Sequence, residues 1–225
     1  MASKAERMLQ QGTPFVVLEG LDGAGTTTQS AALAARLRAE GWEVSTSCEP
    51  SEGPIGTLIR QMLTGRVVVP GEDGARPVGR ETLALLFAAD RLDHIEAQIE
   101  PALRAGKVAI SDRYYHSSLV YQGDIDGEER VDYGWVRELN SRARVPDVTI
   151  FLEAPVELCM SRLSGRGSRD LYETREKLAR LERRYDEVLT MLSAEGQPIV
   201  RLDAGLEREE ISEAIWTVVQ SHLPG

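Results

Sequence analysis

The sequence has few cysteines, no long apolar run and fewer basic than acidic residues. Its two cysteines, Cys48 and Cys159, are too few for a disulfide framework and favour a reduced cytoplasmic protein. Apolar runs such as residues 15–18 and 67–69 are far too short to span a bilayer. Residues 1–12 are polar and of mixed charge, without the apolar core of a signal peptide. The formal charge of −10 argues against a general nucleic-acid partner, although local basic clusters can still bind phosphate.

Composition and patterning predict an α/β fold. Hydrophobic residues make up 42% and charged residues 28% of the 225, which excludes a disordered or collagen-like chain. Short apolar runs predict strands at 15–19, 44–48, 108–111, 148–152 and 199–202. Helical patterns cover 27–40, 55–63, 81–105 with a bend near Pro101, 156–163, 174–192 and 209–222, and a long loop is expected at 65–80. This alternation predicts a doubly wound parallel sheet of about five strands with helices on both faces, in a strand order that the pattern leaves open.

A glycine-rich turn between the first strand and the first helix is the strongest chemical signal. The segment Gly-Leu-Asp-Gly-Ala-Gly-Thr-Thr at residues 20–27 has the context of a phosphate-binding P-loop. Its glycines let several backbone N–H groups point at one anion, and Thr27 stands where a hydroxyl usually holds Mg²⁺. Thr26 takes the place of the usual lysine, so a phosphate would gain a hydrogen bond there but no charge. The alternative is a glycine-rich turn that binds no nucleotide.

Asp112 and Arg113 follow the third strand directly. The carboxyl ends of parallel strands face the ligand crevice, so Asp112 is placed to hold Mg²⁺ beside the P-loop. The alternative for this aspartate is a turn cap. Arg113 favours anion binding, because a guanidinium group grips phosphate through two parallel hydrogen bonds.

Several segments in order resemble the bacterial thymidylate kinases, which are P-loop nucleoside monophosphate kinases. They are residues 19–25, 49–50, 86–94 and 112–122, followed by 146–147 and 162–163, and together they span about 15–203. The resemblance implies a P-loop kinase fold and transfer of the γ-phosphoryl group of ATP to dTMP with Mg²⁺. It also implies a homodimer without nucleic-acid or membrane partners. One kinase domain is expected over 1–225, with a polar extension at 1–13 and a mobile lid at 164–173.

The resemblance also assigns roles to individual residues. The catalytic set that it implies is Asp22, Arg113, Arg166 and Arg169. The implied ATP site is Gly20, Leu21, Asp22, Gly23, Ala24, Gly25, Thr26, Thr27 and Thr28. The implied dTMP site is Asp22, Pro50, Arg60, Phe87, Arg91, Arg113, Ser118, Tyr121 and Gln122. The metal would be held by Thr27 and Asp112.

These roles suit the chemistry of the residues, and each has a plainer alternative. Phe87 would stack on thymine, or else belong to the core of its helix. Arg91, one turn further on the same face, would clamp the dTMP phosphate with Arg113, or else form a surface ion pair. Ser118, Tyr121 and Gln122 would read the base edge and pack under the sugar. Tyr121 would favour deoxyribose by filling the space of a 2′-hydroxyl, or else pack in the core.

Three departures from the family pattern remove positive charge. Thr26 replaces the P-loop lysine, Cys48 replaces the arginine before the Glu-Pro pair, and Leu171 replaces a lid arginine. We expect a lid arginine, Arg166 or Arg169, to make good the missing lysine; the alternative is a solvated basic loop. Two further functions therefore stay open: a kinase for another nucleoside monophosphate, and a nucleotide-binding protein with weak or lost activity.

Overall fold

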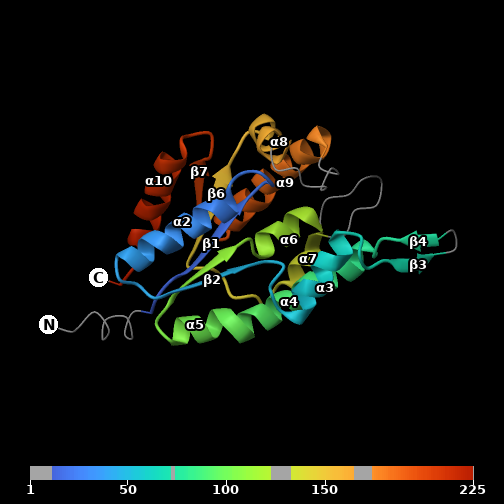
Figure 1. Ribbon diagram of the computed structural model, residues 1–225, viewed down its shortest axis with the longest axis horizontal. Helices are drawn as coiled ribbons and strands as arrows, with labels where there is room; N and C mark the ends of the chain where they lie inside the picture. Colours follow the sequence, from blue (N-terminus) through green and yellow to red (C-terminus); the bar gives the residue numbers. More distant parts are fainter. Residues whose placement is uncertain (1–11, 72–73, 123–132, 165–173, 225) are drawn as a thin grey trace.

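Five short parallel strands form the centre of the computed structural model, which describes residues 12–71, 74–122, 133–164 and 174–224 (Figure 1). The strands are β1 (Phe15–Gly20), β2 (Val44–Cys48), β5 (Val108–Asp112), β6 (Val148–Glu153) and β7 (Ile199–Asp203), in the spatial order β2-β5-β1-β6-β7. The strands and the sheet that the apolar runs predicted are confirmed. The strand order is new information, because the alternation of strands and helices does not say at which edge of the sheet each new strand is added.

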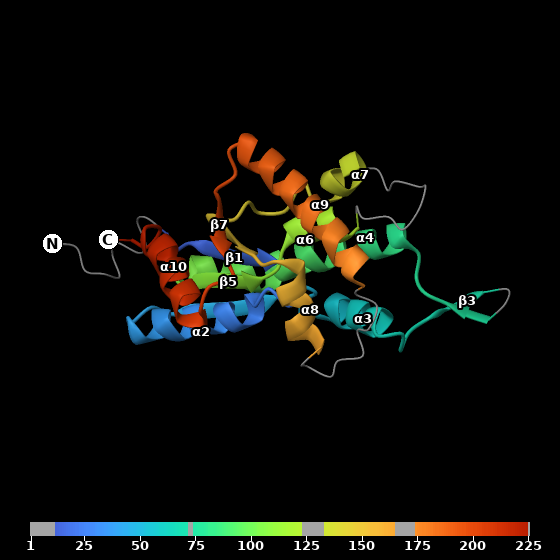
Figure 2. The same ribbon diagram turned by 90° about the horizontal axis from the view of Figure 1, so that it is seen from above.

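Helices cover both faces of this sheet. They are α2 (Thr26–Ala39), α3 (Pro54–Leu63), α4 (Arg80–His94), α5 (Glu100–Arg104), α6 (Tyr115–Tyr121), α7 (Tyr133–Leu139), α8 (Val156–Ser164), α9 (Arg175–Ala194) and α10 (Arg208–Gln220). Figure 2 shows α2 and α10 on one face and α6 and α9 on the other. The six helical patterns are confirmed to within two residues at either end, whereas α6 and α7 were not predicted. No helix in the described ranges combines the length and the apolar character needed to cross a bilayer.

The central strand β1 positions the site. All six of its residues are buried, as expected for a parallel strand with helices on both faces. It pairs with β5 on one side and β6 on the other, and the register sets Leu18 opposite Asp112 and Gly20 opposite Leu152. The glycine-rich turn therefore leaves the sheet beside the carboxyl end of β5.

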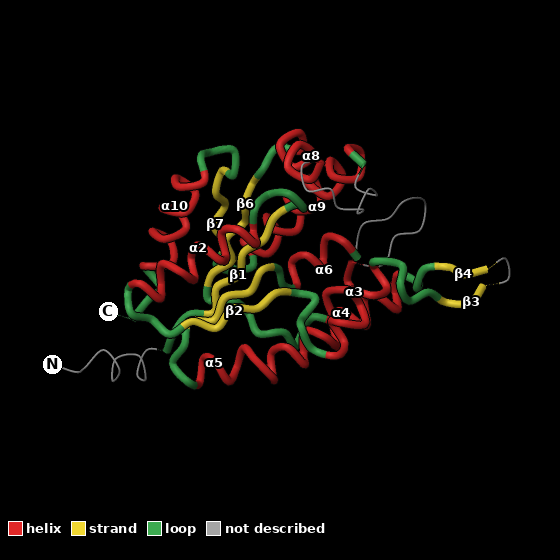
Figure 3. The backbone as a smooth tube through the Cα atoms, viewed as in Figure 1, coloured by secondary structure: helices red, strands yellow, loops and turns green. Residues whose placement is uncertain are grey.

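Two segments differ from the sequence prediction. The segment 65–80, expected as a loop, contains the antiparallel hairpin of β3 (Val69–Gly71) and β4 (Gly74–Arg76), which projects from the body of the molecule (Figures 1 and 3). Within it Gly71 pairs with Gly74 and Pro70 pairs with Ala75, so two short paired strands stand where the glycines and prolines predicted a loop. The long helix after it changes to a π-helix at Ile95–Ile99, just before Pro101, which has no N–H to donate to the carbonyl of Ala97.

Candidate active site

The turn between β1 and α2 has the backbone of an anion-binding loop. The amide of Ala24 donates to the carbonyl of Leu21 at 2.9 Å, and Gly23 and Gly25 have φ angles of 89° and 107°, which favour glycine. A Cβ atom on Gly23 would also lie 2.7 Å from the carbonyl oxygen of Cys159 in α8. The N-cap residue of α2 is Gly25, which has no side chain to cap the helix, so the first amides of α2 and the positive end of its dipole serve the loop.

Thr26 fills the lysine position of this loop with a buried side chain. It is 6% exposed, and its Cγ2 methyl group would lie 3.3 Å from a Cβ atom on Gly20. Thr28, one residue further into α2 than Thr27, is half-buried. The loop therefore offers backbone N–H groups and hydroxyls to an anion, and no cationic side chain of its own.

Thr27 and Asp112 meet beside the loop. The hydroxyl of Thr27 donates to Oδ2 of Asp112 at 2.5 Å, and the register of β1 and β5 brings the end of β5 beside the turn that leads into α2. The second carboxylate oxygen, Oδ1, is buried and accepts no hydrogen bond from the described part of the chain. A hydroxyl and an unsatisfied carboxylate oxygen are hard ligands of the kind that Mg²⁺ prefers. No cluster of three or more His, Cys, Asp or Glu side chains within the described ranges suits a metal, but Mg²⁺ usually needs only one or two carboxylates with substrate phosphates.

Arg113 joins the glycine-rich loop to the neighbouring cavity. Its Nη1 donates to the carbonyl of Gly20 at 2.9 Å and to the Ser117 hydroxyl at 3.0 Å, and its Nη2 donates to Asp22. The backbone of Arg113 has φ 70°, in the left-handed region that non-glycine residues seldom adopt. Such a conformation persists only where the surroundings hold it, and it is frequent at functional sites.

Glu19 holds the backbone that follows Arg113 in place. Its side chain is fully buried and accepts from the amide of Tyr114 at 2.8 Å, from the Ser117 hydroxyl at 2.7 Å and from the Tyr185 hydroxyl at 3.1 Å. Burial raises the pKa of the Glu19 carboxyl, and Arg113 together with the hydrogen bonds from Ser117 and Tyr114 opposes the rise. Glu19 therefore fixes the start of α6 and the position of Arg113.

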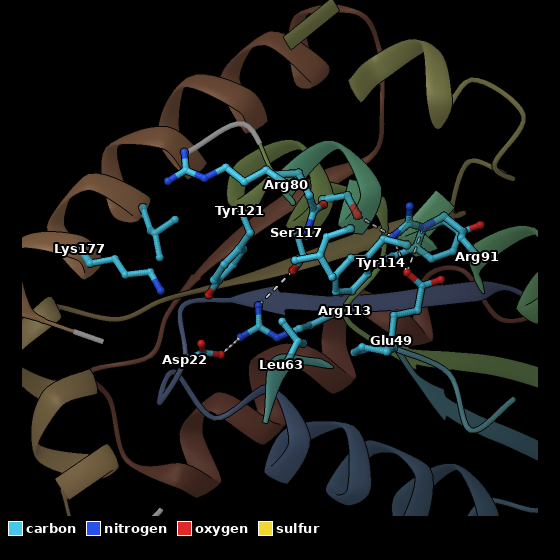
Figure 4. A pocket seen from close by; sticks show the side chains of 16 residues that line it. Asp22, Glu49, Leu63, Arg80, Arg91, Arg113, Tyr114, Ser117, Tyr121 and Lys177 are labelled. Carbon is cyan, nitrogen blue, oxygen red and sulfur yellow. Dashed lines mark hydrogen bonds and ion pairs between the residues drawn. The ribbon is translucent and has the colours of Figure 1, made fainter. Parts of the chain in front are cut away.

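A cavity of about 400 Å³ opens next to Arg113 (Figure 4). Eight of the nine residues expected at dTMP line it: Asp22, Pro50, Phe87, Arg91, Arg113, Ser118, Tyr121 and Gln122. The ninth, Arg60, does not line it; its guanidinium donates instead to the carbonyl of Pro50 at 2.6 Å. Phe87 and Tyr121 are only partly buried and face the cavity, so neither is a plain core residue.

Arg91 forms a buried ion pair, which rules out the surface pair left open above. Its side chain and that of Glu49 are 2% and 3% exposed, and Nε and Nη2 donate to Oε2 of Glu49 at 2.9 and 2.6 Å. Nη2 also donates to the Ser118 hydroxyl at 2.9 Å, and Nη1 donates to Asn140. With four of its five N–H groups engaged, Arg91 does not present an open fork to a phosphate.

The two ends of the cavity differ in chemistry. Figure 4 shows Asp22 and Lys177 at one end and Glu49 with Arg91 at the other. The lining has four cationic side chains against two carboxylates; the cations are Arg80, Arg91, Arg113 and Lys177. A local excess of positive charge in a chain of net charge −10 indicates an anionic ligand.

Not every expected residue can be compared with the cavity, and some residues that contribute to the site were not expected. Arg166, Arg169 and Leu171 lie outside the described residues. Cys48 is half-buried, with Sγ 3.6 Å from the carbonyl of Pro50, and burial raises the pKa of its thiol. The contributions that sequence reasoning missed are those of Glu19, Glu49, Arg80, Ser117, Lys177 and Tyr185. Glu19, Glu49 and Ser117 lie in the segments that resemble the family, so the sequence held a signal for them. Arg80, Lys177 and Tyr185 become visible only when the helices are placed.

Comparisons with known proteins agree on one family. A family model described as thymidylate kinase matches residues 18–215. The chain is 38% identical over 214 residues to the "Probable thymidylate kinase" of Thermococcus onnurineus, covering 93% of this chain and 98% of that one. It is 37% identical over 211 residues to the "Thymidylate kinase" of Thermomicrobium roseum, covering 91% and 93%.

Proposed function

Since the chain belongs to the thymidylate kinase family, we propose that it transfers the γ-phosphoryl group of ATP to dTMP, giving ADP and dTDP. One observation supports this most strongly. Arg113 donates to Gly20 and Asp22 of the P-loop and also lines the cavity with Phe87. A guanidinium between a donor-phosphate loop and an aromatic-walled cavity suits phosphoryl transfer between two nucleotides, because it places positive charge where the two phosphates would meet.

The acceptor occupies the cavity in this proposal. Phe87 stacks on the thymine ring, and Ser118, Tyr121 and Gln122 contact the base edge and the sugar. Arg91 donates to Ser118, so its place is at the base end, with Glu49 balancing its charge. Arg113 is then the arginine that grips the dTMP phosphate, while Pro50 forms part of the wall and Arg60 supports Pro50 from behind.

The donor lies on the P-loop. The backbone of residues 20–28 holds the ATP phosphates, and Asp22 orients Arg113 at the boundary between the two nucleotides. Thr27 and Asp112 would hold Mg²⁺, whose charge would help to neutralise the phosphate oxygens. The unsatisfied Oδ1 atom of Asp112 supports this assignment, since a buried carboxylate oxygen without a partner needs one.

The reaction needs no strong general base. An anionic oxygen of the dTMP phosphate forms a bond to the γ-phosphorus, and the bond from that phosphorus to the β–γ bridging oxygen breaks. The bonding electrons leave with ADP, and charge is conserved without proton transfer. The protein therefore contributes position and positive charge. We assign Arg166 and Arg169 of the lid, residues 164–173 of a single kinase domain, to cover the transferring phosphoryl group and exclude water.

A homodimer and a cytoplasmic location are part of the proposal. Leu85 and Leu92 are 50% and 42% exposed and lie seven residues apart on α4, and Leu58 on the contacting helix α3 is also exposed. An apolar stripe of this kind supports a contact with a second copy of the chain. Mass measurement by light scattering tests it, and a Leu85→Glu, Leu92→Glu variant of monomer mass would support this face. Both cysteines are free thiols, as a reducing compartment would keep them.

Acceptor selectivity tests the proposed reaction. The protein is incubated with Mg-ATP and equal concentrations of dTMP, dUMP and dCMP, and the nucleoside diphosphates are separated by ion-exchange chromatography. We expect dTDP as the main product. A main product of dCDP or dUDP would assign the chain to a different acceptor, and tight dTMP binding without any diphosphate would show a binding protein instead.

A further inference from the structure

The P-loop has a deficit of charge that its own residues cannot supply. The side chain of Thr26 is neutral, buried and packed toward Gly20. The charges of Arg113 and Arg91 are each balanced by a carboxylate, Asp22 and Glu49 respectively. Transfer of a phosphoryl group between two anionic nucleotides needs a further cation where the groups meet.

Lys177 stands at that place. It lines the same cavity as Asp22 and Arg113, and Figure 4 shows its ammonium nitrogen directed toward Asp22 and the hydroxyl of Tyr121. Asp22 belongs to the P-loop, so this end of the cavity is the one next to the donor site. The side chain of Lys177 is partly buried, which strengthens its interaction with a nearby phosphate relative to that in bulk water.

The helix that carries Lys177 is firmly held. The amide of Lys177 donates to the hydroxyl of Thr174, the N-cap residue of α9, at 3.2 Å. Leu178 and Leu181 are fully buried in the core. The lysine therefore extends from a fixed helical position into the cavity, rather than from the lid segment that precedes α9. A charge placed in advance needs little reorganisation during the reaction.

We infer that Lys177 is a catalytic residue that supplies, from α9, the ammonium group that Thr26 removes from the P-loop. Its ligand is the set of anionic oxygens where the terminal phosphate of ATP meets the phosphate of dTMP. A lysine suits a phosphoryl group that moves during the reaction, because its ammonium is a compact charge with three donors on a flexible stem. This inference rests on the proposed phosphoryl transfer and adds a fixed charge to those of the lid.

Four proteins test it by steady-state kinetics with dTMP and Mg-ATP: the wild type, Lys177→Met, Lys177→Arg and Lys107→Met. Lys107 is a matched control, because it pairs with Glu43 at 3.3 Å and does not line the cavity. We expect Lys177→Met to lower kcat roughly 10²-fold with a KM for dTMP close to that of the wild type. The arginine variant should retain most of the activity, and the Lys107 variant all of it.

A second substitution in the same protein tests whether Lys177 replaces the lysine that is missing from the P-loop. Adding Thr26→Lys to Lys177→Met should recover at least tenfold in kcat. A kcat of Lys177→Met within twofold of the wild type would overturn the inference, and so would a rise in the KM for dTMP with kcat unchanged. If the double variant is misfolded, as judged by circular dichroism, the contrast between Lys177→Met and Lys177→Arg decides. A wild type without dTMP-dependent turnover would refute the proposed function itself, which keeps the two failures apart.

Discussion

Removing the carboxyl of Glu49 should destabilise the fold and weaken dTMP binding together. In the wild type this carboxyl accepts two hydrogen bonds from Arg91, at 2.9 and 2.6 Å, and both side chains are almost completely buried. His94 Nδ1 lies 3.2 Å from its other oxygen. The substitution Glu49→Ala leaves a buried guanidinium without its counter-charge, which typically destabilises by about 3–5 kcal/mol. For a chain of this length that corresponds to a Tm lower by about 6–20 °C.

Thermal unfolding by calorimetry and the KM for dTMP are the two measurements. Glu49→Gln keeps an acceptor oxygen for Arg91 and should lie between the wild type and Glu49→Ala. The control is Glu195→Ala, which breaks the exposed pair with Arg137 and should change stability by less than about 1 kcal/mol. If Glu49→Ala were no more destabilising than this surface control, the buried pair would not hold Arg91. The proposed role of Arg91 beside the base of dTMP would then be wrong.

Four further predictions concern single steps of the account. Phe87→Ala should raise the KM for dTMP about tenfold or more and change that for ATP little, because only the acceptor loses a stacking partner. Thr27→Ala should raise the Mg²⁺ concentration for half-maximal turnover about tenfold or more, measured by titration at fixed ATP. Replacing Arg166 and Arg169 together with alanine should lower turnover roughly 10²-fold in the same assay. Burial, and secondly Arg91, lowers the pKa of His116 to about 3, so the unfolded chain takes up this proton first and stability falls as pH drops below about 6.5. Between pH 7 and 5 the wild type should lose about 2 kcal/mol more unfolding free energy than His116→Gln, measured by urea denaturation.

The outcomes that would contradict these predictions are equally specific. Equal changes in the two KM values would remove Phe87 from the acceptor site, and an unchanged Mg²⁺ requirement would remove Thr27 from the metal. Near wild-type turnover of the double arginine variant would leave the lid without a part in charge stabilisation. Parallel pH profiles for the wild type and His116→Gln would show that the imidazole is not buried in its neutral form.

The sheet and most helices are predictable because their signals are local. The strand over residues 44–48 agrees residue for residue with β2, and the helix over 55–63 differs from α3 by one residue. α6 was missed because it is short and follows a functional motif, so Tyr115 and its neighbours were interpreted by chemistry rather than by periodicity. The hairpin of β3 and β4 was missed because its strands have three residues each and lie outside the main sheet.

The site was predictable where a motif carried it and unpredictable where partners come from distant elements. The glycine-rich turn with Thr27 and Asp112 follows from the rule that parallel strands end at one edge, and the structure places Thr27 beside Asp112. The partner of Arg91 is 42 residues away at Glu49, and that pairing is the reason why we propose that Arg91 lies beside the base of dTMP rather than at its phosphate. Lys177 carried no signal in sequence, since a lysine near a helix start is ordinary; only the packing of α9 brings it to the cavity.

The most direct test of the central claim is ADP release from Mg-ATP, measured with and without dTMP at one enzyme concentration. We predict rapid ADP formation that depends on dTMP and is matched mole for mole by dTDP. That result would show that a P-loop with Thr26 in place of lysine supports phosphoryl transfer. ADP formation that is negligible, or that is the same without dTMP, would contradict the assignment of the cavity to this acceptor.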